Sequence, residues 1–514
     1  MAGKIITSYI ALAAGLLFAP NAMSQVQQDD LQEAQEKGVA PIVVTGTRIQ
    51  RDGYSAPTPL TALSMEDIDA SAPANVADFV NEIPSVVGSA TPANSNLNMS
   101  SGTSGLNTIN LRGLGSSRTL VLLNGQRSVG SALGGQVDVN TFPQGLISGV
   151  EVVTGGASAA YGSDAVTGVV NFILDEKYTG LKASVETGIS TYGDAANRKF
   201  DATFGTPFAD GRGHILLNGE IAVRDGLNSV PRDWNNEGWY QITNPAYAPG
   251  NGQSERLIAD KAGLSLATPG GLITGGSLRG TYFGNGGTIG QLDYGTVSDP
   301  WFVGGDWQLT QVNNTQSLDP EENRKNIFGR ISYEVAPWLN VFAQASYSRS
   351  VNSGQLGIHR NQGNVTIQAD NAFLPDSIQT QLLAANETSF KFGTTNADLG
   401  IRTNETKRGV QRYVVGADGE FNLFGNVARW DAYIQKGIAK TRESALGIAN
   451  NTRLTQATDA VFAPAGNSLG VAAGTIVCRS SLTSPDNGCI PLNRFGTNVA
   501  DPDAVDWILG DLYR

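Results

Sequence analysis

The chain has 514 residues, enough for two or three domains with sizeable cores. Its net charge of −12 argues against binding along nucleic-acid phosphates, and two His and two Cys are too few for a zinc or haem site. Charged residues are only 16% of the chain and 62 residues are Gly, which favours short strands and long polar loops. No stretch beyond the N-terminus has the roughly 18 consecutive apolar residues of a membrane-spanning helix.

The N-terminus has the three parts of a secretory signal peptide. Lys4 is basic, residues 5–18 are an apolar segment, and Ala22-Met23-Ser24 fits a cleavage site with small residues. We therefore expect residues 1–24 to be a cleaved signal peptide that exports the chain from the cytoplasm. A short buried helix is the alternative.

The two cysteines are predicted to be bridged. Compartments outside the cytoplasm permit disulfides, and Cys478 and Cys489 enclose ten residues with the Ser, Pro, Asp, Asn and Gly typical of a loop. We expect a disulfide at the base of this loop. Two unpaired thiols are the alternative, and a metal site is not expected.

Residues 25–54 are predicted to be a flexible leader. Residues 25–40 are polar and acidic without an apolar stripe. A run of mostly β-branched residues follows, which favours an extended backbone; it comprises Ile42, Val43, Val44 and Thr45. Such a run beside a flexible leader invites strand addition by a partner. The alternative is an ordinary first strand of the following domain.

Residues 55–178 are predicted to form a compact α+β domain. Apolar residues at helical spacing predict a helix over 75–83 that ends at Pro84. Residues 88–108 are a long polar loop, and Asn124-Gly125 predicts a tight turn after a strand. Strands are expected over residues 119–123, 150–154 and 169–174.

From residue 180 to 514, apolar and polar residues alternate in the manner of an antiparallel transmembrane β-barrel, whose strands separate lipid from a wet interior. Short connections (207–212, 336–338, 423–426) alternate with very long ones (225–323, 352–408, 444–514). This asymmetry is typical of outer-membrane barrels. A soluble β-sandwich also shows the alternation but has no reason to separate short from long connections. Trp338, Phe421, Phe424 and Trp430 lie near the short turns, as an interfacial aromatic girdle would.

Seven strands are expected in this part of the chain: 181–190, 198–206, 213–224, 324–335, 339–350, 410–422 and 427–441. Bacterial single-chain barrels close with an even number of strands, from about 8 upward. We therefore expect an incomplete barrel, with residues 444–514 in an external loop. The alternative is that the loop 225–323 hides further strands, with Gly271 to Phe283 as the best candidate.

Enzyme-like motifs are absent or incomplete. No Gly-Lys-Ser/Thr sequence follows the glycines, and Gly113-x-Gly115 lacks the third glycine of a dinucleotide fingerprint. Gly156-x-Ser158-x-Ala160 only loosely resembles a nucleophile elbow, and neither His214 nor His359 is well placed as its base. We expect no catalytic residue, no metal and no cofactor.

Four segments in order resemble the plug domain of TonB-dependent outer-membrane receptors. They are Ile-Val-Val-Thr-Gly-Thr-Arg from residue 42, Leu-Arg-Gly from 111, Leu-Leu-Asn-Gly-Gln-Arg from 122, and the Gly-rich segment from Val150 to Asn171. The positions that carry the plug motif are Arg112, Gly113, Asn124, Gly125, Gly155, Gly156, Ser158, Tyr161, Gly162, Gly168 and Asn171.

This resemblance implies a plug folded inside a barrel of about 22 strands, within the known range for such barrels. It implies that residues 42–45 are a TonB box, which pairs with TonB, and that an inner-membrane complex supplies the energy. Two features depart from the family. Thr154 replaces an arginine that many members use to lock the plug to the barrel wall, so only Arg112 is carried over. Sixteen residues lie between the expected cleavage site and Pro41, too few for a signalling domain.

The predicted function is energised uptake of a scarce, bulky extracellular solute across the outer membrane of a Gram-negative cell. The expected partners are TonB with its inner-membrane complex, outer-membrane lipid and the solute, and not nucleic acid. The solute is expected to be an oligosaccharide or a ferric siderophore, because aromatic residues in the first long loop could stack on sugar or aryl faces. A passive porin and a secreted β-sandwich adhesion protein are the alternatives.

Overall fold

The structure is a computed structural model that describes residues 60–64, 75–99, 101–155, 157–312 and 315–513. The predicted signal peptide (residues 1–24) and the whole predicted leader (residues 25–54), which includes Ile42 to Thr45, lie outside the described residues. Among the described residues, no helix is long and apolar enough to cross a membrane.

The N-terminal domain is built on a mixed five-stranded sheet in the order β1-β4-β5-β2-β3. The parallel pair β2–β5 is flanked by antiparallel neighbours. The strands are β1 (Leu60–Ser64), β2 (Thr119–Leu123), β3 (Gln126–Arg127), β4 (Ile147–Thr154) and β5 (Gly168–Leu174), and the helices are α3 (Val76–Asn81), α4 (Pro92–Ser95) and α5 (Ser158–Tyr161). Helix α3 begins where Asn75 accepts a hydrogen bond from the backbone N–H of Asp78 (3.0 Å). Its apolar face packs in a core with Phe142 and Phe172.

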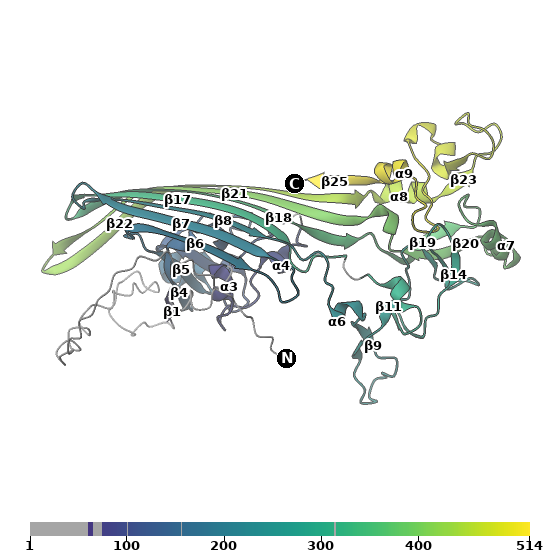
Figure 1. Cartoon of the computed structure of the whole chain (residues 1–514), viewed down its shortest axis with the longest axis horizontal. Helices are drawn as coiled ribbons and strands as arrows, with labels where there is room; N and C mark the ends of the chain where they lie inside the picture. The colour runs from purple at the N-terminus through teal and green to yellow at the C-terminus, as the bar shows by residue number, and fades with distance from the viewer. Residues whose placement is uncertain (1–59, 65–74, 100, 156, 313–314, 514) are drawn as a thin grey trace, which may run out of the picture.

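A long antiparallel sheet of eight strands follows, in the order β25-β22-β21-β18-β17-β8-β7-β6. Its strands are β6 (Gly180–Gly188), β7 (Asn197–Phe208), β8 (Gly213–Arg224), β17 (Glu321–Ala336), β18 (Leu339–Ile358), β21 (Ile401–Leu423), β22 (Asn426–Ala449) and β25 (Leu509–Tyr513). The sheet curves over the N-terminal domain (Figure 1). Strands β6 and β25 are its two edges and do not pair with each other.

The two faces of the long sheet differ in chemistry. Along β17, Ile327 and Ile331 are 60% and 47% exposed, whereas the alternate residues Arg324 and Asn326 are buried. The same alternation gives exposed Phe200 and Phe204 on β7 beside buried Asp201 and Thr203. The sheet therefore has an apolar outer face and a polar inner face that contacts the N-terminal domain.

The two ends of the long sheet also differ (Figure 1). Tight turns join β7 to β8, β17 to β18 and β21 to β22 at one end, and the long connections lie at the other. These connections carry short strands: β9 (Tyr240–Thr243), β10 (Arg256–Ala259), β11 (Ala262–Leu264), β12 (Leu272–Ile273), β13 (Thr281–Phe283), β14 (Ile289–Gln291), β15 (Thr296–Ser298), β16 (Trp301–Val303), β19 (Asn361–Gln368), β20 (Ser389–Thr394), β23 (Ala460–Phe462) and β24 (Ile476–Cys478). Their helices are α6 (Asp233–Asn236), α7 (Asp376–Ala384), α8 (Asn451–Thr458) and α9 (Pro502–Ile508). We call this part of the chain the outer region.

The predicted fold class, an α+β domain followed by an antiparallel sheet, is confirmed, but the count of seven strands is wrong. Residues 444–514 are not one loop, because β22 continues to Ala449 and β25 returns to pair with it. Strand β25 has only five residues, too few to show an alternation in the sequence. The segment Gly271 to Phe283 does form strands β12 and β13, but they belong to a separate five-stranded sheet of the outer region.

Candidate functional site

The turn at Asn124-Gly125 is fixed by side chains of the predicted motif. Both residues have positive φ (51° and 70°), the conformation of a type I′ hairpin turn between β2 and β3. The Asn124 side chain accepts a hydrogen bond from the backbone N–H of Leu174 (2.6 Å) and donates to Glu176 (2.7 Å). Asn171 accepts from the N–H of Gly125 (2.8 Å). These amides tie the turn to the end of β5.

The Gly-rich motif is also explained by packing. Gly168 has φ of 142°, and a Cβ there would overlap the carbonyl oxygen of Val153 on β4. Gly155 and Gly162 also have positive φ (137° and 92°). Tyr161 is buried, and its carbonyl accepts a hydrogen bond from Arg127 (2.6 Å). Gly168 therefore allows close approach of two backbone segments, and Gly155 and Gly162 adopt backbone conformations that other residues rarely take.

The remaining predicted motif residues are at the surface or undescribed. Arg112 and Gly113 form a turn with positive φ (57° and 68°), in which the Arg112 side chain is exposed. Ser158 begins α5 and is exposed. Gly156 lies outside the described residues, as do the residues of the predicted TonB box.

A buried clamp holds the polar loop of residues 101–104 against the long sheet. Glu443 on β22 accepts hydrogen bonds from the backbone N–H groups of Gly102 (3.2 Å) and Ser104 (3.3 Å). Arg408 on β21 donates to the carbonyl oxygens of the same two residues, both at 3.0 Å. The register explains the pairing: Glu443 lies opposite Thr406 and Arg408 opposite Thr441, so both side chains reach the inner face.

Arg408 also faces the N-terminal domain's buried Asp138, with 3.9 Å between guanidinium and carboxylate. Burial raises the pKa of the Asp138 carboxyl, and the positive charge of Arg408 opposes this rise. Asp138 further accepts hydrogen bonds from the backbone N–H groups of Asn107 and Asn140 (3.2 Å each). The ion pair and these hydrogen bonds make this carboxylate a second point of attachment between the sheet and the domain.

A second buried cluster lies on β8 and β17. Arg324 bonds to Glu220 (3.0 Å) and Glu322 (3.3 Å), and all three side chains are at most 7% exposed. Asn326 donates to Glu220 (3.2 Å) and to the carbonyl of Asn140 in the N-terminal domain (2.8 Å). Buried charges are costly unless they are paired, and the bond from Asn326 to the carbonyl of Asn140 ties this paired cluster to the N-terminal domain.

The end of the N-terminal domain's sheet makes a third set of contacts. Glu176 pairs with Arg330 on β17 (2.9 Å) and accepts a hydrogen bond from Gln344 on β18 (3.3 Å). Arg412 on β21 donates to Gln126 in β3 (2.7 Å). Glu176 also holds Asn124, so the motif turn is connected directly to the wall of the long sheet.

The comparison with known families identifies the N-terminal domain. Residues 52–169 match the family model described as the TonB-dependent Receptor Plug Domain. This segment is a TonB-dependent receptor plug domain. Receptors with a plug domain of this family are outer-membrane transporters and not enzymes; they generally interact with TonB and bind extracellular solutes.

Solved structures similar to the chain include three receptors. The ferric enterobactin receptor PfeA, in complex with BCV-L6, is 18% identical with a TM-score of 0.40, over 77% of this chain and 42% of that one. The siderophore receptor PirA from Acinetobacter baumannii is 15% identical with a TM-score of 0.35, over 81% and 52%. FpvA of P. aeruginosa bound to a pyoverdine–iron complex is 14% identical with a TM-score of 0.38, over 79% and 45%. The chain spans about half the length of these structures.

The contacts between plug domain and sheet were not singled out by the sequence. Glu220 and Arg324 fall within the predicted strands 213–224 and 324–335 without any mark that sets them apart, and Arg408 and Glu443 fall just beyond the predicted strands 410–422 and 427–441. The one signal that could have indicated these contacts is a charged residue at a position that faces inward, because a wet interior would accept any polar residue there. Among the described residues, no group of three or more His, Cys, Asp or Glu could hold a metal ion. The arrangement binds and positions the plug domain through hydrogen bonds and ion pairs.

Two large cavities lie in the outer region. One of about 490 Å³ is lined by residues of β19 and α8 together with Arg494. Another of about 400 Å³ is lined by Tyr240 and Trp301, whose rings stack at 4.2 Å, and by Arg360. Trp234 and Trp239 are exposed, whereas Trp307 packs against a small apolar core. The aromatic residues of the first long loop therefore divide between exposed positions and loop cores.

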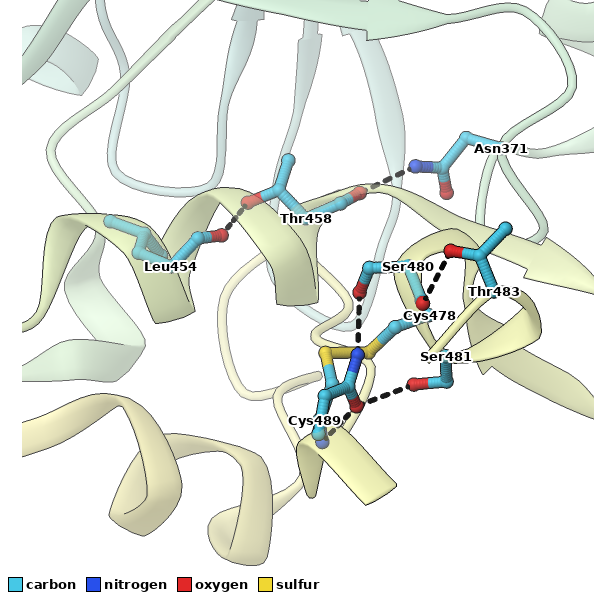
Figure 2. The surroundings of a disulfide bond; sticks show 9 residues. Asn371, Leu454, Thr458, Cys478, Ser480, Ser481, Thr483 and Cys489 are labelled. Atoms are coloured by element: carbon cyan, nitrogen blue, oxygen red, sulfur yellow. Dashed lines mark hydrogen bonds between the residues drawn. A yellow bond between two sulfur atoms is a disulfide. The ribbon is translucent and has the colours of Figure 1, made fainter. Parts of the chain in front are cut away.

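Figure 2 shows the disulfide between Cys478 and Cys489. It closes a loop in which Asn487 accepts hydrogen bonds from Ser481 and from the backbone N–H of Cys489 (both 2.9 Å). Nearby, Asn371 donates to the carbonyl of Thr458 at the end of α8 (2.7 Å). The bridge thus closes the loop beside the elements that line the larger cavity.

Proposed function

We propose that the chain acts in a TonB-dependent outer-membrane receptor that takes up a scarce, bulky solute. The observation that carries the proposal is the pairing of a plug domain with the polar face of a long antiparallel sheet whose other face is apolar. A sheet with this division of faces suits a wall between lipid and a plugged interior.

The outer face supports placement in a membrane. Large apolar side chains are exposed along its strands, among them Leu217, Ile221, Val415 and Ile434. Trp338 and Phe424, 55% and 95% exposed, lie at the short-turn end, where an aromatic girdle would meet the lipid headgroups. In this proposal residues 1–24 direct export, residues 25–54 are the leader, and the outer region faces the outside of the cell.

Energy would enter through residues 42–45. Because this run is rich in β-branched side chains, it is suited to pair as a strand with TonB, which is driven by its inner-membrane complex. The solute would be an oligosaccharide or a ferric siderophore, bound first in the outer region and released past the plug domain.

The test uses Val43→Pro, which removes one backbone N–H and restricts φ, with Val43→Thr as the control that keeps both. Solute binding to cells should be unchanged in both variants, whereas uptake should be lost only with proline. A protonophore should abolish uptake by the native protein. Normal uptake by Val43→Pro would contradict the TonB box, and uptake that survives the protonophore would favour a passive porin.

A further inference from the structure

The cavity of about 490 Å³ in the outer region has the features of a built binding site. It lies between strand β19 and helix α8, and Arg494 forms part of its wall. The carbonyl of Thr458, at the end of α8, accepts a hydrogen bond from Asn371, which follows β19 (Figure 2). This bond holds the two walls of the cavity together.

The lining is rich in amides and hydroxyls. Asn364 and Gln368 are exposed on β19 and lie four residues apart. Asn451 and Thr455 are exposed at positions i and i+4 on one face of α8. Amide side chains both donate and accept hydrogen bonds, which suits a ligand with many hydroxyl groups. None of the lining residues is aromatic, so the cavity offers no surface for stacking an aryl group.

Arg494 gives the cavity an uncompensated positive charge. It is 7% exposed, and its hydrogen bonds go to the neutral oxygens of Thr458 (3.0 Å), Asn361 (2.8 Å) and Asn396 (2.6 Å). Its Nε has no hydrogen-bond partner among the described residues, and no charged group of the described chain acts on its pKa. Burial lowers the pKa of Arg494 to about 10, which leaves the guanidinium charged at neutral pH.

Two other charges of the described chain have partners. The buried Arg324 has two carboxylate partners. The acid of the cavity wall, Asp459, is already paired with Arg479, whose Nε lies 3.1 Å from a carboxylate oxygen. A buried cation without a counter-charge is costly in a folded protein and commonly marks a functional site. A carboxylate carried by the ligand would supply the missing charge.

We propose that this cavity binds an acidic sugar unit, with the amides and hydroxyls of β19 and α8 receiving its hydroxyl groups and Arg494 attracting its carboxylate. The inference rests on the proposed function and narrows the solute to an acidic oligosaccharide. A neutral sugar would leave the charge of Arg494 unmatched, and an aryl siderophore would find no aromatic surface in the cavity.

The test is calorimetric titration of the full chain in detergent with trigalacturonate, compared with the same trisaccharide after its carboxyl groups have been reduced to alcohols. The native protein should bind the acidic form at least about tenfold more tightly, the factor expected of one charge-assisted hydrogen bond. Equal affinity for the two forms, or no binding of the acidic one, overturns the proposal. Ferric citrate is the third probe, and tighter binding of ferric citrate than of trigalacturonate also overturns it.

Two variants locate the site. Arg494→Gln should remove the preference for the acidic form. Because Arg494 also holds three neighbours, Asn364→Asp is the second variant: it adds a negative charge at the rim without touching those bonds and should weaken only the acidic form, by about threefold or more. Arg453→Gln on α8 and Asn386→Asp after α7 make the same charge changes away from the cavity lining and should alter nothing. An unchanged affinity in Asn364→Asp overturns the assignment.

These outcomes are independent of transport. If trigalacturonate binds in this way but uptake does not depend on the proton gradient, the proposed function fails and the site stands. If energised uptake of another solute is found while trigalacturonate does not bind, only the site assignment fails.

Discussion

Removal of the Glu443 carboxylate should release the loop of the plug domain that it holds. In Glu443→Ala, the backbone N–H groups of Gly102 and Ser104 lose their acceptor, and Arg408 loses a neighbouring negative charge. A hydrogen bond to a charged group contributes about 1.5–3 kcal/mol. Water can enter and replace part of two such bonds, so we expect local opening of the loop to become easier by about 3 kcal/mol, or more than about 100-fold.

Hydrogen exchange measured by mass spectrometry on the protein in detergent checks this directly, because the two freed N–H groups are themselves the reporters. Peptides that contain residues 101–106 should exchange more than about 100-fold faster, and Glu443→Gln, which keeps one oxygen acceptor, should fall between. Glu405→Ala is the matched control: it removes an acid from the adjacent strand, where Glu405 pairs with Lys407 at a partly exposed position, and should change stability by less than about 1 kcal/mol. Unchanged exchange at Gly102 and Ser104 in Glu443→Ala would refute the clamp.

Three further outcomes are expected. Replacing Cys478 and Cys489 with Ser opens a loop with a sequence separation of 11, which should lower the local free energy of unfolding by up to about 3 kcal/mol. The chain should then be cut more readily by trypsin at Arg479. Free thiols in the folded native protein would contradict the bridge. Gly168→Ala should lower the melting temperature of the plug domain, because it should reduce the free energy of unfolding by about 2 kcal/mol or more. Gly125→Ala, whose Cβ would meet no atom within 4 Å, should reduce it by only about 1 kcal/mol. Equal losses would contradict the close approach at Gly168. Burial lowers the pKa of His359, which bonds to the carbonyl of Gly447 (2.9 Å), so its contribution to stability is full above the unfolded value of about 6.5 and is lost as the pH falls through the folded pKa. Exchange near Gly447 should therefore quicken on acidification, and His359→Asn should remove that pH dependence.

The predictable parts of the fold are those with local signals. The turn at Asn124-Gly125 and the strands β7, β8 and β17 follow from turn chemistry and from alternation, which exists where one face meets an apolar medium and the other a polar one. Strand β21 begins at Ile401, nine residues before its predicted start. Its first part, Ile401 to Gly409, carries mostly polar and charged residues, because neither face there needs to be apolar, so no alternation remains to be read.

The contacts of the site depend on register, which the sequence does not contain. Glu443 and Arg408 meet the same two residues of the plug domain only because β21 and β22 pair with Thr406 opposite Glu443. Arg494 shows the same limit in the outer region. Nothing near it in the sequence indicates that it is buried between residues that lie more than 30 and more than 130 positions earlier, Thr458 and Asn361.

The length of β22 has a consequence for where solutes first meet the protein. Its 24 residues, at a rise of about 3.3 Å each, extend for roughly 80 Å. Crossing the hydrocarbon layer takes only about 10 residues of a tilted strand. In the proposed orientation, more than half of this strand extends into water beyond the lipid and connects to the outer region at its far end. Capture of a solute and opening of the plug domain would then take place at different heights along one continuous wall, and a detergent belt around the lower part would leave the upper part free to bind.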